Sequence, residues 1–102
     1  MAMTPEGRVK AKVVKVLKAL GVYFFFPATH GFGRSGVPDI VCCIPPTGLF
    51  FAIECKAGDN KPTRLQELEI ESIRRAGGRA IVVNESNIGQ LQWLLEKMIV
   101  GA

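Results

Sequence analysis

The sequence has little of what several classes of small protein depend on. It contains three cysteines and one histidine in 102 residues, and an odd number of cysteines without a secretory signal argues against a disulfide framework. Cys42 and Cys43 are adjacent, so their side chains point to opposite faces of a strand, which argues against a structural zinc site. No apolar run approaches the ~20 residues that cross a bilayer. We therefore expect a cytoplasmic protein with no membrane partner.

Blocks of like charge, internal repeats and base-reading motifs such as the helix-turn-helix are also absent. The 13 lysines and arginines exceed the 9 acidic residues, and the formal net charge of +4 suits a polyanionic partner such as DNA. A lysine series on the polar side of the first helical segment is typical of a solvated face and can also contact phosphates: Lys10, Lys12, Lys15 and Lys18. We expect residues 1–102 to form a single domain.

Apolar periodicity and turn residues predict the order helix, three strands, helix, strand, helix. The first helix begins at Thr4-Pro5-Glu6 and ends at Gly21, and the last begins near Ser86 or Asn87 as its cap. The other elements are expected over 22–26, 39–44, 49–56, 63–76 and 79–83. The second and third strands form a hairpin, and the helical crossover makes the third and fourth parallel. This predicts an α/β fold with a mixed sheet flanked by helices, in which the apolar strands 39–44 and 49–56 are buried on both faces.

Charged residues nevertheless interrupt these apolar strands. Pro38-Asp39 opens the second strand and Glu54-Cys55-Lys56 closes the third. Because side chains alternate along a strand, Glu54 and Lys56 share a face, and the hairpin brings Asp39 beside them. Two carboxylates there, with the backbone carbonyl of Cys55, offer the oxygen ligands that Mg²⁺ or Mn²⁺ prefers, and Lys56 can orient or deprotonate an attacking water. The spacing predicts a metal-dependent site for phosphodiester hydrolysis.

Each residue alone also has an ordinary structural interpretation. Aspartate next to proline is frequent where a loop enters a strand, and Glu54 and Lys56 can form an ion pair at a strand end. The combination of these residues at this spacing favours the metal site. His30 lies in a glycine-rich loop, and we assign it no chemistry.

With these motifs in this order, the chain resembles the PD-(D/E)xK nucleases, which have a restriction-endonuclease-like core, and more narrowly the virus-type replication-repair nuclease (VRR-NUC) domain. The resemblance extends from Glu6 to about Leu95. It rests on an acid in the first helix and four later runs: Glu6, Arg34–Val41, Ile53–Lys56, Pro62–Gln66 and the segment 76–83. It implies that Asp39, Glu54, Lys56 and Gln66 are catalytic, and that Glu6 joins Asp39 and Glu54 at a Mg²⁺ for which Mn²⁺ substitutes. No other cofactor is implied.

Two of these residues have a competing local explanation. Glu6 lies in the first helical turn, where the helix dipole favours an acid, but its spacing to Val9 and Val13 places it on the inward face, which favours a functional role. Thr63 and Gln66 fit the capping-box pattern. A capping role and a functional role therefore explain Gln66 equally well.

Residues flanking the predicted site are candidates for contact with DNA. Arg34 and Ser35 are close enough to Asp39 to reach a phosphate, although a mobile surface loop is the alternative. We also expect Lys61 and Arg64 to contact DNA.

The expected function is that of a Mg²⁺-dependent endodeoxyribonuclease that recognises branched DNA by backbone shape. The resemblance implies a four-way (Holliday) junction resolvase-like homodimer in a bacterial or phage-infected cell, because two symmetric cuts need two sites. A flap, branched-end or less selective nuclease is the alternative among enzymes. A nuclease-like DNA-binding module without catalysis is the alternative from another class.

Overall fold

The computed structural model describes residues 3–28 and 33–100, so His30 lies outside the described residues. Its elements are α1 (Pro5–Ala19), β1 (Tyr23–Phe25), β2 (Ile40–Ile44), β3 (Leu49–Cys55), α2 (Arg64–Arg75), β4 (Arg79–Val83) and α3 (Ile88–Val100). The strands form one sheet in the order β1-β2-β3-β4, in which β3 and β4 are parallel and the other pairs are antiparallel. The predicted element order and mixed sheet are confirmed. No helix within the described ranges is long and apolar enough to span a membrane.

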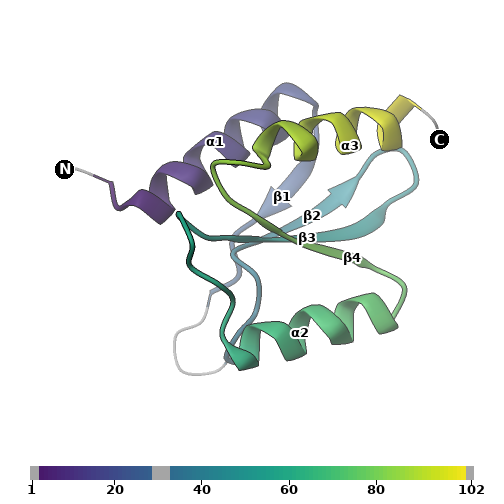
Figure 1. The fold of residues 1–102 in the computed structure, drawn as a ribbon. Helices are drawn as coiled ribbons and strands as arrows, with labels where there is room; N and C mark the ends of the chain where they lie inside the picture. The colour runs from purple at the N-terminus through teal and green to yellow at the C-terminus, as the bar shows by residue number, and fades with distance from the viewer. Residues whose placement is uncertain (1–2, 29–32, 101–102) are drawn as a thin grey trace.

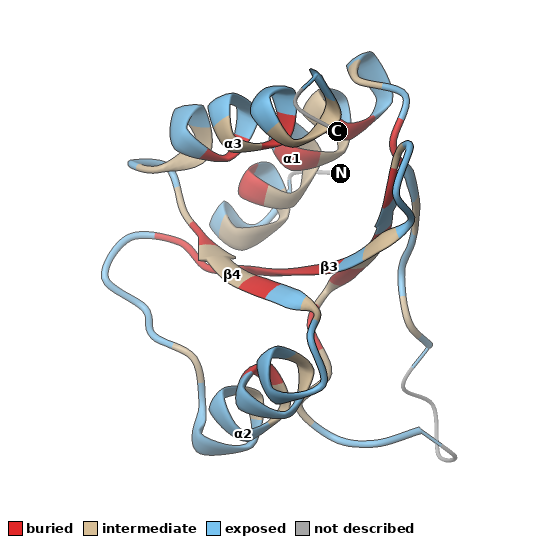
Figure 2. Cartoon of the chain, turned by 90° about the vertical axis from the view of Figure 1, so that its right-hand side faces the viewer, coloured by how far each residue is buried: buried red, intermediate tan, exposed pale blue. Residues whose placement is uncertain are grey.

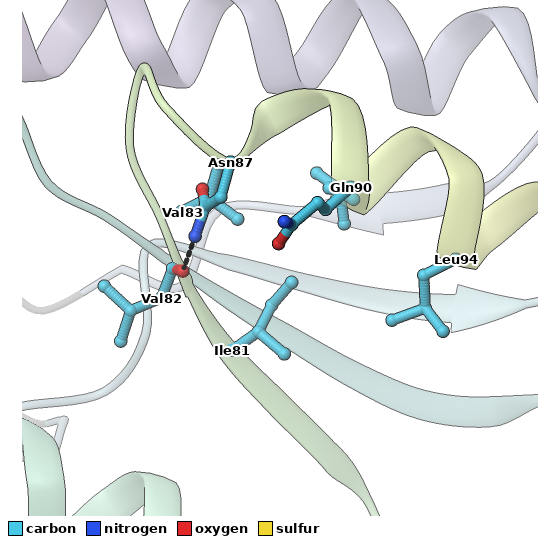
Figure 3. A pocket seen from close by; sticks show the side chains of 7 residues that line it. Ile81, Val82, Val83, Asn87, Gln90 and Leu94 are labelled. Carbon is cyan, nitrogen blue, oxygen red and sulfur yellow. Dashed lines mark hydrogen bonds between the residues drawn. The ribbon is translucent and has the colours of Figure 1, made fainter.

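Short-range polar contacts fix the ends of the helices. The Thr4 hydroxyl accepts a hydrogen bond from the Gly7 N–H at 3.0 Å, with Pro5 in the first turn, as the sequence predicts for α1. At α3 the Asn87 carbonyl accepts the first helical bonds, from Gln90 and Leu91. The Asn87 side chain does not cap the helix but donates to the Val82 carbonyl at 3.0 Å (Figure 3). It therefore fastens the start of α3 to the end of β4.

Helices cover the two faces of the sheet unequally, as Figures 1 and 2 show. Helices α1 and α3 lie together on one face and build the main core with the inward side chains of the strands. Helix α2 lies alone on the other face, where Ile70 packs with Ala52 and Ala80. The main core consists of the following buried residues: Val9, Val13, Leu17, Val22, Ile40, Cys42, Ile44, Phe51, Ile53, Cys55, Val83, Leu91 and Leu95.

The prediction that both hairpin strands are buried on both faces is correct for β3 and wrong for β2. Residues Phe51 to Cys55 are all buried, whereas Cys43 in β2 is exposed. The reason is that the single helix on this face packs against the β3 and β4 half. Three aromatic side chains on or beside the uncovered half stay in solvent: Tyr23 at 68%, Phe25 at 49% and Phe50 at 45% exposure.

Candidate active site

Asp39 lies at the point where the chain enters β2, next to the end of β3. The register pairs Ile40 with Ile53, so the hairpin places Asp39 beside the Glu54–Lys56 run. The backbone N–H of Cys55 donates to Asp39 Oδ2 at 2.8 Å. This bond fixes the carboxylate against the β3 backbone, so its orientation does not depend on a mobile surface loop.

Glu54 is a buried carboxylate, 2% exposed. Its Oε2 accepts a hydrogen bond from Gln66 Nε2 at 3.0 Å and lies 3.5 Å from Lys56 Nζ. Its Oε1 is buried and has no hydrogen-bond partner among the described residues. Burial, and then the charge of Asp39, raises the pKa of Glu54 to about 7, although the ammonium of Lys56 opposes the shift. Among the described residues, Glu54 therefore has too few hydrogen-bond donors and too little neighbouring positive charge to stabilise its ionised form fully.

Lys56 brings α1 and β3 together at the same point. Its side chain is nearly buried, and its Nζ lies 3.5 Å from Glu54 Oε2 and 3.9 Å from Glu6 Oε1. Its backbone N–H donates to the Val83 carbonyl at 2.9 Å, which continues the pairing of β3 with β4. Glu6 thus reaches the site from the first turn of α1, and the ammonium is fixed between two carboxylates.

Gln66 caps α2 and also contacts Glu54. Its Oε1 accepts from the Thr63 N–H at 2.8 Å and its N–H donates to the Thr63 hydroxyl at 3.2 Å, which completes a capping box. Its Nε2 donates to Glu54 Oε2. One end of the amide begins α2 and the other orients Glu54, so capping and a contact with the site are not alternatives here.

The donor atoms fit a hard divalent cation better than a soft one. No cluster of three or more histidine, cysteine, aspartate or glutamate side chains able to hold a metal is found over residues 3–28 and 33–100. Mg²⁺ does not need such a cluster, because it binds through one or two carboxylates and keeps several waters. Asp39 and Glu54 supply that number, and the unpartnered Glu54 Oε1 is an oxygen that a cation would satisfy. A pocket of about 190 Å³ gives solvent access to Asp39 and the neighbouring Cys55, whereas Glu54 is not among its lining residues. The pocket is lined by Thr4, Glu6, Gly7, Lys10, Asp39 and Cys55.

The loop before Asp39 rests on the start of α2. Gly36 has a φ of +83°, and a Cβ at this position would lie 2.7 Å from the carbonyl carbon and oxygen of Leu65 and 2.9 Å from the nitrogen of Gln66. A residue without a side chain is needed for this contact. The same loop places Arg34 3.4 Å from Glu69, with most of the guanidinium in solvent.

Replacing Gly36 by alanine is expected to lower the free energy of unfolding by roughly 2–3 kcal/mol and to slow catalysis, because the clash displaces Gln66 from Glu54. Gly58→Ala is the matched control. Gly58 also has a positive φ, of +57°, but a Cβ there would have nothing within 4 Å, so its expected cost is about 1 kcal/mol with unchanged catalysis. Chemical denaturation and single-turnover cleavage measure both effects. Equal losses in the two variants would contradict the packing role.

The predicted DNA-contacting residues all lie on the surface. Ser35, Lys61 and Arg64 are exposed, and Arg34 shares its guanidinium with Glu69, which competes with a phosphate for the same donors. The pocket between β4 and α3 in Figure 3 is separate from the candidate active site, because it shares no lining residue with the pocket beside Asp39. None of its lining residues is ionisable.

Sequence reasoning did not separate Lys10 from the other lysines of α1, yet Lys10 lines the site pocket with Glu6 and Asp39. Its position four residues after Glu6, one helical turn along the same face, was the available signal.

Comparisons with known proteins show which family the sequence and the fold resemble. No family model matches the sequence. The chain is 32% identical over 82 residues, 80% of its length and 84% of the relative's, to "Putative nuclease p44" of Acyrthosiphon pisum secondary endosymbiont phage 1. A solved "VRR_NUC domain" superposes with a TM-score of 0.74 at 30% identity, covering 92% of this chain and 97% of that one. A "VRR_NUC domain protein" shares the fold with a TM-score of 0.71 at 21% identity, covering 95% and 88%.

Proposed function

Because this chain belongs to the VRR-NUC nuclease family, we propose that it is a metal-dependent endonuclease that hydrolyses phosphodiester bonds in branched DNA. The observation that carries the proposal is the buried Glu54, whose Oε1 is unpartnered among the described residues, beside Asp39 and Lys56. Burying an unpaired carboxylate oxygen costs stability. A fold selected for stability alone has no use for this arrangement, whereas a cation-binding site does.

The carboxylates of Asp39 and Glu54 are the proposed metal ligands, assisted by Glu6 and by the backbone carbonyl of Cys55. Mg²⁺ is the proposed cation and Mn²⁺ a substitute, since both take oxygen ligands. When bound, the cation polarises the phosphate and lowers the pKa of a water molecule. The hydrogen bond from Cys55 N–H orients Asp39 for this role before any cation arrives.

Lys56 and Gln66, which both contact Oε2 of Glu54, are proposed to act at the same point. The ammonium of Lys56, fixed between Glu54 and Glu6, offsets the negative charge that grows on the phosphate oxygens in the transition state and orients the attacking water. The amide of Gln66 keeps Glu54 Oε2 in place. This leaves Oε1, which has no hydrogen-bond partner among the described residues, as the proposed coordinating oxygen.

DNA is proposed to be recognised through its backbone. The net charge of +4 favours a polyanion, and Arg34, Ser35, Lys61 and Arg64 are proposed to contact phosphates around the start of α2. Phosphate contacts carry no direct base sequence information, which fits selection by DNA shape. We propose a four-way junction as the preferred substrate.

A homodimer is proposed because a four-way junction is resolved by two symmetric cuts. The surface that supports this is the uncovered side of β1, β2 and the start of β3, where Tyr23, Phe25 and Phe50 are exposed. None of these is charged, so the surface does not suit DNA. Strand β1 is also an edge strand, and an edge strand that pairs antiparallel with its own copy generates a two-fold axis.

Phe25→Glu is expected to convert the dimer to a monomer, since two charges would face each other at a desolvated interface. Light scattering after size exclusion measures the mass directly. Trp93→Glu is the matched control, because Trp93 is also an exposed aromatic residue, at 60% against 49% for Phe25, but lies on α3. A wild-type mass of one chain at all concentrations, or loss of the dimer in the control as well, would contradict this assignment.

The function is tested by incubating the wild-type protein with Mg²⁺ and labelled duplex, single-stranded, flap, splayed-arm and four-way substrates. We expect cutting of the four-way junction in paired, symmetric positions, and no cutting in EDTA. Preferential cutting of flaps or splayed arms would replace the junction assignment with a branched-end nuclease. Binding without cutting in both Mg²⁺ and Mn²⁺ would overturn the enzymatic proposal.

A further inference from the structure

We propose that Lys10 is a phosphate-binding residue of this site, aimed by the ring of Phe26. The inference rests on the proposed nuclease function and adds a second lysine, beside Lys56, to the proposed active site. Lys10 lines the same pocket of about 190 Å³ as Glu6, Asp39 and Cys55. It is partly buried there, whereas Lys15 on the same helix is exposed.

The position of the Lys10 ammonium is set by an aromatic ring. Its Nζ lies 4.2 Å from the centroid of the Phe26 ring, within the ~6 Å over which cation–π attraction operates. Phe26 follows the end of β1, and its ring lies 5.9 Å from that of Phe24 at an angle of 52°. A flexible lysine side chain is thereby held over the pocket, and less of its rotamer freedom remains to be lost when a ligand binds.

The charge of Lys10 is not neutralised by the carboxylates that share the pocket. In the part of the chain that the structure describes, the salt bridges involve Arg34 and Lys56 but not Lys10. Asp39 Oδ2 accepts the Cys55 N–H, and Glu6 faces Lys56. A ring attracts an ammonium without removing its charge, so Lys10 stays available for an anion.

A phosphodiester is the anion that fits this position. Glu6 and Asp39 line the pocket and repel any anion that approaches, so a substrate phosphate needs positive charge close to them. Lys56 is nearly buried and faces Glu54 and Glu6. Lys10 is the cation that lines the pocket itself, which makes it the residue to meet a phosphate of the DNA strand next to the carboxylates.

The test compares Lys10→Met with Lys15→Met, which lower the formal net charge equally, from +4 to +3. Binding to a labelled four-way junction is measured by fluorescence anisotropy in EDTA over a range of salt concentrations, so that no cleavage is required. For Lys10→Met, loss of the phosphate contact is expected to weaken binding by roughly 5- to 10-fold per bound subunit near 0.1 M salt and to reduce the salt slope by about 0.9 per bound subunit. Lys15→Met should weaken binding by no more than about 2-fold and leave the salt slope unchanged.

Variants of Phe26 test the aiming role and do not alter charge. Phe26→Leu is expected to weaken binding about 2- to 4-fold with an unchanged salt slope, and Phe26→Tyr, which keeps the ring, to restore it. Equal behaviour of Lys10→Met and Lys15→Met would overturn the phosphate contact. Should Lys10→Met fail to fold, wild-type binding by Phe26→Leu would overturn the inference and rescue by Phe26→Tyr would support it. Wild-type cutting with no Lys10 effect refutes this inference alone, whereas absence of wild-type cutting refutes the proposed function.

Discussion

Replacement of Asp39 by alanine is expected to abolish cleavage while DNA binding is retained or becomes stronger. The variant loses a carboxylate from the proposed metal site, and loss of several kcal/mol of charge stabilisation corresponds to a rate at least ~1000-fold lower. Binding persists because removing a negative charge near the phosphate lowers repulsion. Single-turnover cleavage in Mg²⁺ and anisotropy in EDTA give the two quantities separately.

The structural cost of Asp39→Ala is expected to be small by comparison. The change removes the hydrogen bond that Asp39 Oδ2 accepts from Cys55 N–H at 2.8 Å, which is worth about 1 kcal/mol of stability. Asp39→Asn keeps an acceptor for this bond, so it should remain folded like the wild type and still be inactive. Asp59→Ala, in an exposed loop, is the charge-matched control and should cut normally. Wild-type activity in Asp39→Asn would remove Asp39 from the proposed metal ligands.

The elements of the fold were predictable because their determinants are local. Thr4, Pro5 and Gly21 mark the ends of α1 within the sequence itself, and the hairpin follows from two apolar runs separated by a short turn. How far a helix extends over a sheet depends on packing between elements distant in sequence. The apolar strand β2 was therefore wrongly predicted to be buried on both faces, whereas its Cys43 is exposed.

In the candidate site, too, local features were predictable and contacts between distant elements were not. Strand alternation is a rule of backbone geometry that placed Glu54 and Lys56 on one face, and the hairpin placed Asp39 beside them. The double contact of Gln66 was not predictable, because its second partner, Glu54, belongs to another element. The spacing of Lys10 from Glu6 was a local signal, but its contact with the Phe26 ring, which follows β1, was not predictable for the same reason.

Glu54→Gln is expected to have opposite effects on catalysis and stability. Cleavage should fall at least ~1000-fold, because the variant loses the carboxylate with the free oxygen. The metal-free protein should become more stable at pH 8, because the pKa of Glu54, raised to about 7 despite the ammonium of Lys56, means that the site favours a neutral group, and Lys56 still faces Glu6. Glu96→Gln, exposed on α3, is the charge-matched control and should leave both quantities unchanged.

The pH dependence of stability identifies the origin of that gain. The pKa of Glu54 is about 7 in the folded protein and 4.5 as its ordinary value, so the folded state holds this proton more tightly. The contribution of Glu54 to stability is fully present below about pH 4.5 and is lost as the pH rises through about 7. The stability gap between Glu54→Gln and the wild type should widen by roughly 2–3 kcal/mol between pH 5 and pH 8.

Mg²⁺ should reduce the difference in stability between Glu54→Gln and the wild type by stabilising the wild type. A cation that binds the folded state raises its stability with concentration, and above pH 7 the ionised Glu54 is the form that binds. Thermal unfolding at pH 8 should therefore shift upward with Mg²⁺ in the wild type and not in Glu54→Gln. A gap independent of both pH and Mg²⁺ would mean that the carboxylate is satisfied by the protein alone. The destabilising charge of Glu54 would then have no catalytic explanation.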